Sequence, residues 1–239
     1  MTTTDVFFAH LDSEIAQTGA IENDFYSRFR QGGMSQAELK FFADQYYYYI
    51  RTFPQILAGL SSRVDLEPVR AELAKTIVSE LGGGDPDKIH FKMFERAIAP
   101  LDVTVDPIDE VDHIPEAAGL VDGIRALFLH DSIPAAIGGH YTIEQTGLPM
   151  ISSLYEGFRT YPQSTYESME YFYLHLLVEH EHVAWITRAV EPYLGDPAGR
   201  AEVERGALTI AGLLAAFWQG LSRELPQVPG KLLAPAATS

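Results

Sequence analysis

His175-Leu-Leu-Val-Glu179-His-Glu-His182 is the stretch of this chain that most clearly predicts its structure. Each residue of an α-helix turns by about 100°, so the positions four and seven places after His175 lie about 40° and about 20° from it around the helix. His175, Glu179 and His182 therefore share one helix face. Three metal-binding side chains on one face predict a metal site inside a helical fold; the competing interpretation is a His–Glu ion pair on a solvated helix.

The rest of the chain also has the spacing of helices. Apolar residues recur every three or four positions, and no segment alternates between apolar and polar residues as a β-hairpin does. The sequence therefore predicts an all-α, single-domain bundle of seven to eight helices over residues 1–225, followed by a flexible tail over residues 226–239. A long connection is expected at residues 101–115. A first helix is expected at residues 5–31, and a second begins at a capping box of Ser35 and Glu38 and kinks at Pro54. A third is expected from Pro68 to Gly82 and a short fourth from Asp85. The later helices are expected at residues 115–130, 132–161, 164–194 and 198–225.

The composition excludes several classes of function. The 239 residues include 17 Lys and Arg against 33 Asp and Glu, a formal net charge of −16, so the chain repels nucleic acid and anionic lipid. The absence of cysteine excludes disulfides, a thiolate nucleophile and cysteine-bound metal. Because no apolar stretch reaches the roughly 18 residues of a membrane span and no signal-peptide pattern is present, we expect a cytoplasmic protein with a small-molecule substrate and neither nucleic acid nor membrane as partner.

Three further ligand-type residues lie elsewhere in the chain. Glu80 and His90 stand on either side of Gly82-Gly-Gly84, where one helix ends and another begins, so a helix–turn–helix can direct both inward. Glu144 lies among glycines and other small residues, which predicts close helix packing and a buried carboxylate in need of a partner. His140, one turn earlier, could add a ligand or contact one. Together with the first three residues they supply three carboxylates and three imidazoles, which suit two metal ions better than one zinc.

This set resembles the metal-binding pattern of the heme-oxygenase-like di-iron oxidases and oxygenases. In that pattern a Glu and a His flank a helix break, a lone Glu follows, and His-x-x-x-(Asp/Glu)-x-x-His comes last. The resemblance implies a heme-oxygenase-like helical fold without haem, two iron ions or a manganese–iron pair, and O2 as co-substrate. It implies as metal ligands Glu80, His90, Glu144, His175, Glu179 and His182.

A closer resemblance, over residues 7–185, is to the self-sacrificing para-aminobenzoate synthases, a branch of this superfamily found in chlamydiae. That branch converts one of its own tyrosines into product and takes an amino group from a lysine. Tyr26 matches the tyrosine, which implies a catalytic redox or substrate-contact role, whereas Tyr155 stands at the lysine position and indicates a different reaction. The likeness is densest at Asp24-Phe-Tyr26, Ser35-Gln-Ala-Glu-Leu39, Tyr46-Tyr47, Phe53-Pro54 and Ser62-Arg63.

The sequence therefore favours an O2-dependent non-heme di-iron enzyme that acts on a small amino-acid-derived metabolite. The expected reaction is C–H activation leading to desaturation, C–C cleavage or decarboxylation, with electrons from the substrate or an external donor. The alternatives are an N-oxygenase acting on an amine, a self-sacrificing aminobenzoate synthase and a non-catalytic helical binding protein. Arg63 is a candidate to bind a substrate carboxylate through paired hydrogen bonds, with a surface salt bridge as the other use. A homodimer is compatible with the resemblance.

Overall fold

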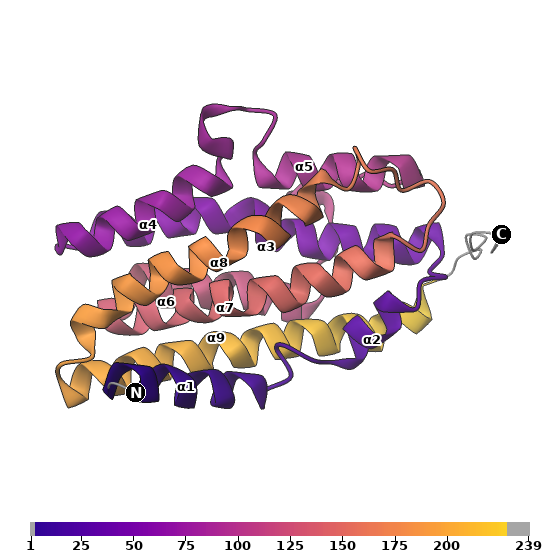
Figure 1. The fold of residues 1–239 in the computed structure, drawn as a ribbon. Helices are drawn as coiled ribbons and strands as arrows, with labels where there is room; N and C mark the ends of the chain where they lie inside the picture. Colours follow the sequence, from indigo (N-terminus) through magenta and orange to yellow (C-terminus); the bar gives the residue numbers. More distant parts are fainter. Residues whose placement is uncertain (1–2, 229–239) are drawn as a thin grey trace.

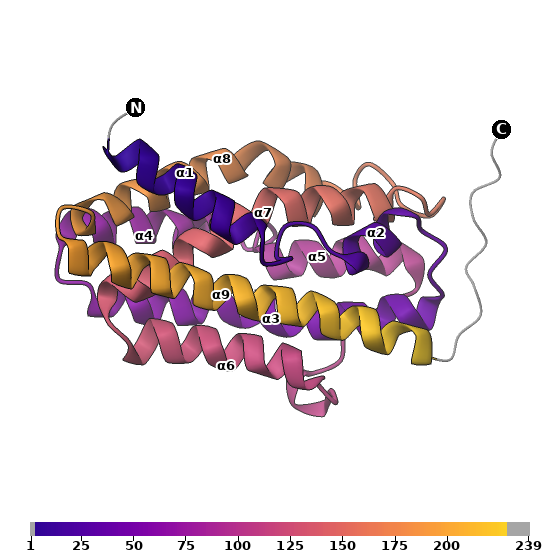
Figure 2. The same ribbon diagram turned by 90° about the horizontal axis from the view of Figure 1, so that it is seen from below.

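The computed structural model describes residues 3–228 and shows nine α-helices and no strand among them. The helices are α1 (Thr3–Ala16), α2 (Asp24–Arg30), α3 (Gln36–Arg63), α4 (Glu67–Glu80), α5 (His90–Ile98), α6 (Pro115–His130), α7 (Ile133–Phe158), α8 (Glu170–Val190) and α9 (Pro197–Glu224). The long helices lie side by side in one bundle, and α7 runs through its middle between α8 and α9 (Figure 1). Seen from below, α9 runs between α1 and α6 (Figure 2).

The all-α prediction is confirmed, with one helix more than the seven to eight expected. The region expected as a single helix over residues 5–31 divides into α1 and α2. Gly19 adopts φ +89° in the turn between them, a conformation that only glycine reaches easily. The side chain of Asn23 then accepts a hydrogen bond from the Tyr26 backbone N–H and begins α2.

The start of α3 follows the sequence, and the helix continues past Pro54. Ser35 and Glu38 form the predicted capping box, each side chain accepting a hydrogen bond from the other residue's backbone N–H. Pro54 lies inside the helix, which continues to Arg63. The proline therefore does not end α3, and the kink expected there stays a prediction.

A tight turn separates α4 from α5 and delays the start of α5 to His90 rather than Asp85. Gly82 has φ +82°, and a Cβ atom there would lie 2.8 Å from backbone atoms of Lys88 and Ile89. The chain can return on itself this closely because Gly82 has no side chain. The turn leaves Glu80 as the last residue of α4 and makes His90 the first of α5.

Aromatic side chains fill the core beside α3 and α9. Phe25, Phe42, Tyr46 and Trp218 are almost fully buried, and the rings of Phe25 and Trp218 stack with centroids 5.2 Å apart. Burying a large apolar side chain contributes about 1.5–3 kcal/mol each to stability. This packing holds α2, α3 and α9 together behind the predicted ligands.

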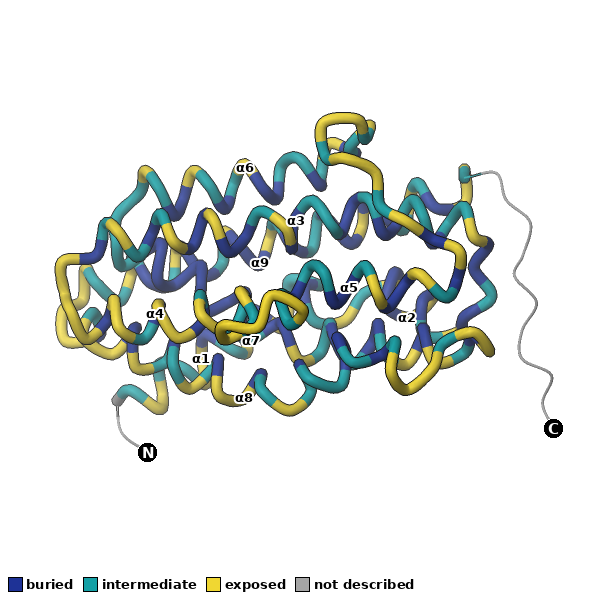
Figure 3. Tube along the Cα trace, turned by 90° about the horizontal axis from the view of Figure 1, so that it is seen from above, coloured by how far each residue is buried: buried dark blue, intermediate teal, exposed yellow. Residues whose placement is uncertain are grey.

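The buried parts of the trace face inward along the helices, and the exposed parts lie outward and in the loops (Figure 3). The segment 101–115 is the expected long connection, anchored by the buried side chains of Leu101, Val103 and Ile114. Within residues 3–228, no helix combines the length and apolarity needed to cross a bilayer. Most of the predicted flexible tail, residues 229–239, lies outside the described part of the chain.

Candidate metal centre

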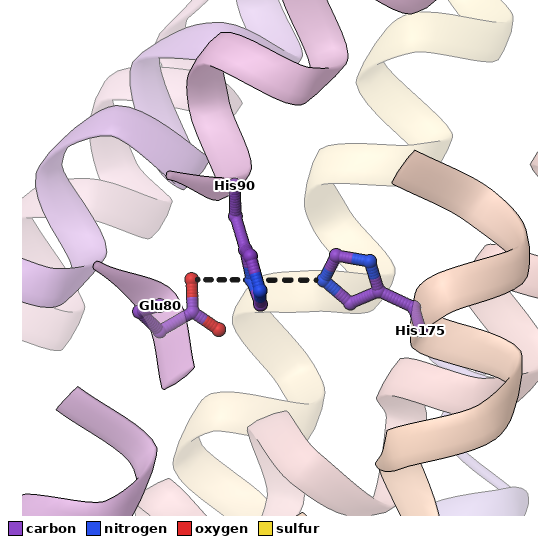
Figure 4. Close-up of side chains that lie close together, drawn as sticks. All are labelled: Glu80, His90 and His175. Atoms are coloured by element: carbon purple, nitrogen blue, oxygen red, sulfur yellow. Dashed lines mark hydrogen bonds and ion pairs between the residues drawn. The ribbon is translucent and has the colours of Figure 1, made fainter. Parts of the chain in front are cut away.

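Glu80, His90 and His175 form the first group of candidate ligands, from α4, α5 and α8 (Figure 4). Nδ1 of His90 lies 3.1 Å from Glu80 Oε2 and 3.0 Å from Nε2 of His175. His175 Nδ1 donates a hydrogen bond to the Tyr171 carbonyl, which leaves its Nε2 as an acceptor. Because a ring nitrogen binds metal through its lone pair when it carries no proton, this hydrogen bond leaves His175 Nε2 in the form that would bind a metal.

Glu144, Glu179 and His182 form the second group, and all three are buried. His182 Nδ1 lies 3.2 Å from Glu144 Oε2, and its Nε2 lies 2.9 Å from the hydroxyl of Ser79. Oε2 of Glu179 is buried and has no hydrogen-bond partner among the described residues. In each group, one candidate ligand atom per residue lies within 4.8 Å of the others.

Burial and the neighbouring charged groups shift the pKa values of these candidate ligands strongly. Burial raises the pKa of Glu179 well above its usual range, and the negative charge of Glu144 raises it further. For Glu144, burial acts in the same direction, but hydrogen bonds with His140 and His182 outweigh it and hold the pKa below its usual range. Burial, followed by the neighbouring His90, lowers the pKa of His175 well below its usual value.

This donor set fits two metal ions. A buried carboxylate oxygen without a partner destabilises the folded protein unless a cation compensates its charge. Glu179 Oε2 is such an atom. Mixed carboxylate and imidazole donors suit iron or manganese. Members of both groups line the same cavity, so the two metal positions would be neighbours. The six ligand residues predicted from the sequence are brought together in space; their role as ligands stays a prediction.

The shared cavity is small and largely apolar. It measures about 40 Å³, room for O2 or a few water molecules. No Lys or Arg side chain is among the residues that line it. Besides Glu80, His90, Glu144, His175 and Glu179, the walls are Tyr46, Tyr49, Ile50, Phe53, Ile143, Gly147, Met150, Ile151 and Tyr171.

Gly147 brings the backbone of α7 close to Glu179. A Cβ atom on Gly147 would lie 2.6 Å from Glu179 Oε2. We therefore expect Gly147→Ala to displace this carboxylate and to weaken metal binding at the second group by about 10- to 100-fold, which a two-step Mn²⁺ titration measures. Gly119→Ala in α6 is the matched control, because its Cβ would meet no atom within 4 Å. Equal affinities in both variants would contradict a ligand role for Glu179.

Tyr26 and Arg63, the other two predicted site residues, do not line the cavity. Tyr26 is buried and packs against Trp218, with ring centroids 4.7 Å apart, and the Trp218 ring in turn lies 6.3 Å from that of Tyr46 in the cavity wall. Arg63 donates hydrogen bonds to the carbonyls of Phe128 and Asp131 and so joins the end of α3 to the end of α6.

Ser79 and Tyr171 contact the candidate ligands His182 and His175, and neither contact was expected from the sequence. Tyr171 precedes His175 by four residues, and Ser79 precedes Glu80 by one. The first spacing places Tyr171 on the ligand face of α8, so helical periodicity could have indicated it. No local pattern indicates the contact of Ser79, because His182 lies on another helix.

Two relatives of the chain are named after small-molecule products. A 4-chloro-allylglycine synthase from Streptantibioticus cattleyicolor is 28% identical over 214 residues, which cover 89% of this chain and 81% of that protein. A 4-aminobenzoate synthase from Chlamydia pneumoniae is 22% identical over 174 residues, which cover 73% of this chain and 76% of that protein. The predicted likeness to the aminobenzoate synthases is therefore confirmed.

Solved structures share the fold. A CADD-like protein of unknown function from Nostoc punctiforme has a TM-score of 0.78 at 18% identity, covering 92% of this chain and 97% of that one. A protein from Shewanella denitrificans described as having a heme oxygenase-like fold has a TM-score of 0.67 at 15% identity, covering 92% and 90%. The predicted heme-oxygenase-like fold is confirmed.

The family model of iron-containing redox enzymes matches residues 40–215, which is most of the chain and includes all six candidate ligands. This match confirms the predicted iron cofactor and the predicted oxidoreductase activity. The chain belongs to the family of iron-containing redox enzymes.

Proposed function

We propose that this protein is an O2-dependent non-heme di-iron enzyme that desaturates, cleaves or decarboxylates a small amino-acid-derived substrate through C–H activation. The observation that carries the proposal is the set of six carboxylate and imidazole side chains from α4, α5, α7 and α8, five of which line one small cavity. The relative named 4-chloro-allylglycine synthase supports the substrate class, because allylglycine is an unsaturated amino acid.

Each group of ligands would hold one metal ion. Glu80, His90 and His175 would hold the first, and the three buried residues of the second group, Glu144, Glu179 and His182, would hold the second. Bound iron supplies the electrons that reduce O2 and the reactivity that removes hydrogen from a C–H bond. Desaturation takes two electrons and two protons from the substrate, whereas reduction of O2 to two water molecules takes four of each. An external donor therefore supplies the other two electrons and two protons.

Two phenols place a proton donor in the cavity wall. The hydroxyls of Tyr46 and Tyr171 lie 2.9 Å apart, and both residues line the cavity. One hydroxyl donates to the other, so the second hydroxyl proton of the pair is free to point into the cavity. Burial raises the pKa of both tyrosines above their usual value, which keeps them protonated. The pair can thus donate a hydrogen bond to a molecule held beside the ligands.

The size and the apolar walls of the cavity limit which molecules can bind beside the candidate ligands. A cavity of about 40 Å³ admits O2 but not an amino acid, so substrate binding requires wall side chains to move. Met150 has an unbranched, flexible side chain and adapts most easily. Since no cationic side chain lines the cavity, the part of the substrate nearest the ligands is an uncharged carbon chain, and the apolar wall keeps water from it.

Anaerobic titration of the metal-free protein with Fe(II) tests the proposal. We expect two ions bound per chain and, after rapid mixing with O2, a transient absorption band. Glu144→Ala should remove the band and one of the two ions, because it deletes a ligand of the second group. Absence of both stoichiometric binding and the transient band in the wild-type protein would overturn the proposal.

Mass spectrometry of products separates the reaction classes. We expect an amino acid that accelerates decay of the transient band to lose two hydrogens, a carbon fragment or CO2, over many turnovers per chain. The mass of the peptide containing Tyr26 should stay unchanged, because Tyr26 does not line the cavity and Tyr155 replaces the lysine of the self-sacrificing branch. A substrate that gains oxygen on nitrogen would indicate an N-oxygenase instead. Loss of Tyr26 with at most one turnover would indicate the self-sacrificing reaction.

A further inference from the structure

His140 lies one helical turn before Glu144 in α7 and is completely buried. Its Nε2 is 2.7 Å from Oε1 of Glu144. Two atoms at this distance share a proton, and an ionised carboxylate has none to give. His140 Nε2–H therefore donates to Glu144 Oε1.

The other side of the imidazole ring is surrounded by apolar groups. Nδ1 of His140 is buried without a hydrogen-bond partner among the described residues. The ring centroids of Phe53 and Phe128 lie 5.9 Å and 6.1 Å from that of His140. A proton on Nδ1 would be a buried donor with no acceptor, so the tautomer with its proton on Nε2 is favoured. The phenyl rings also restrict rotation of the imidazole, which keeps Nε2 directed at Glu144.

The two oxygens of Glu144 consequently have different surroundings. Oε1 accepts the hydrogen bond from His140, whereas Oε2 faces His182 Nδ1 at 3.2 Å. His140 belongs to neither group of mutually close ligand atoms. It stands behind Glu144, with its single proton directed at that carboxylate.

We propose that His140 is a positioning residue that reserves Oε1 of Glu144, so that Glu144 binds the metal of the second group through Oε2 alone. The inference rests on the proposed di-iron function and adds to it a determinant of how one carboxylate coordinates. Without the Nε2–H donor, the carboxylate can turn and offer both oxygens to the metal or turn away from it. Partners of this kind typically change metal affinity by about 10- to 100-fold.

The test uses Zn²⁺, which binds without reacting with O2, in a Glu80→Ala background where only the second group is complete. Calorimetry compares His140, His140→Phe and His140→Gln in that background. Phe keeps an aromatic ring but donates nothing, whereas Gln places an amide N–H at a similar reach. We expect His140→Phe to weaken Zn²⁺ binding by about 10- to 100-fold and His140→Gln to stay within about threefold of the parent. Infrared spectra should show the carboxylate stretching bands of Glu144 closer together in the Phe variant, as for two-oxygen coordination.

Two results would overturn the inference. If the Phe and Gln variants lose affinity equally, the ring shape matters and the donor does not. If neither variant changes the Zn²⁺ affinity or the infrared bands, His140 contributes only to packing and does not position Glu144. Urea unfolding of each metal-free variant identifies a folding defect. If His140→Phe does not fold, His140→Gln still tests the inference. The Zn²⁺ affinity and carboxylate bands of the Gln variant must then match those of the parent. Failure of the wild-type chain to bind two metals would instead reject the di-iron function itself.

Discussion

Glu179→Leu is expected to make the metal-free protein more stable while removing one of its two metal ions. The carboxylate of Glu179 is buried, and its Oε2 has no partner in the described structure. An unsatisfied buried polar group typically reduces stability by about 1–3 kcal/mol, so an apolar side chain of similar length should restore about that much. Urea unfolding of metal-free protein measures the gain, and metal analysis after Fe(II) loading measures the lost ion.

Glu181→Leu is the matched control, because Glu181 is two residues further along α8 and exposed. It should leave both the free energy of unfolding and the metal content close to those of the wild type. A Glu179→Leu variant that unfolds more easily than wild type would show that Glu179 already has a stabilising partner in the metal-free protein. The expected opposition of stability and metal binding is typical of a site maintained for function.

Metal affinity at the second group is expected to rise steeply with pH. Burial alone would lower the pKa of His182, but the hydrogen bond and charge of Glu144 outweigh it and raise the pKa from 6.5 to about 9. Below that pH, His182 in the metal-free protein carries a proton that the metal must displace. Each displaced proton makes the apparent affinity rise about tenfold per pH unit. The His182 contribution should therefore make the affinity increase with pH up to about 9 and not beyond it.

Competition titrations with Mn²⁺ and a chelator at several pH values measure this dependence, and calorimetry in buffers of different ionisation enthalpy counts the released protons. The stability of the metal-free protein should change in the opposite direction. Because the pKa of His182 is raised by folding, its contribution is complete below pH 6.5 and is lost as pH rises through about 9. An affinity that does not change over this range would show that His182 is unprotonated before the metal binds.

The sequence predicted best those features that depend on local geometry. The spacing of His175, Glu179 and His182 fixes their common face on any helix, and all three are buried in the structure. Ser35 with Glu38 and Pro115 likewise identify helix starts, because caps and first-turn prolines act on their own backbone.

Features that depend on distant residues were not predictable in the same way. The guanidinium of Arg63 contacts carbonyls about 65 residues later in the chain, and no local pattern indicates that they, rather than a substrate, accept its hydrogen bonds. Tyr26 matches a family tyrosine in sequence, yet it packs against Trp218 and does not line the cavity, which follows from how α2 packs on α9. The late start of α5 depends on the positive φ of Gly82, which sequence alone does not specify.

The turn between α4 and α5 is expected to make metal ions bound by the two groups exchange at different rates. Residues 81–89 include no buried residue, and an ion pair between Lys88 and Glu170 ties them to the start of α8. Segments with so little buried surface open locally far more often than the whole protein unfolds. Because Glu80 and His90 flank this turn, one such opening would displace two of the three candidate ligands of the first group and none of the second. We therefore expect an iron ion held by the first group to exchange faster than one held by the second, and amide hydrogen exchange in residues 81–89 to slow when that ion is bound.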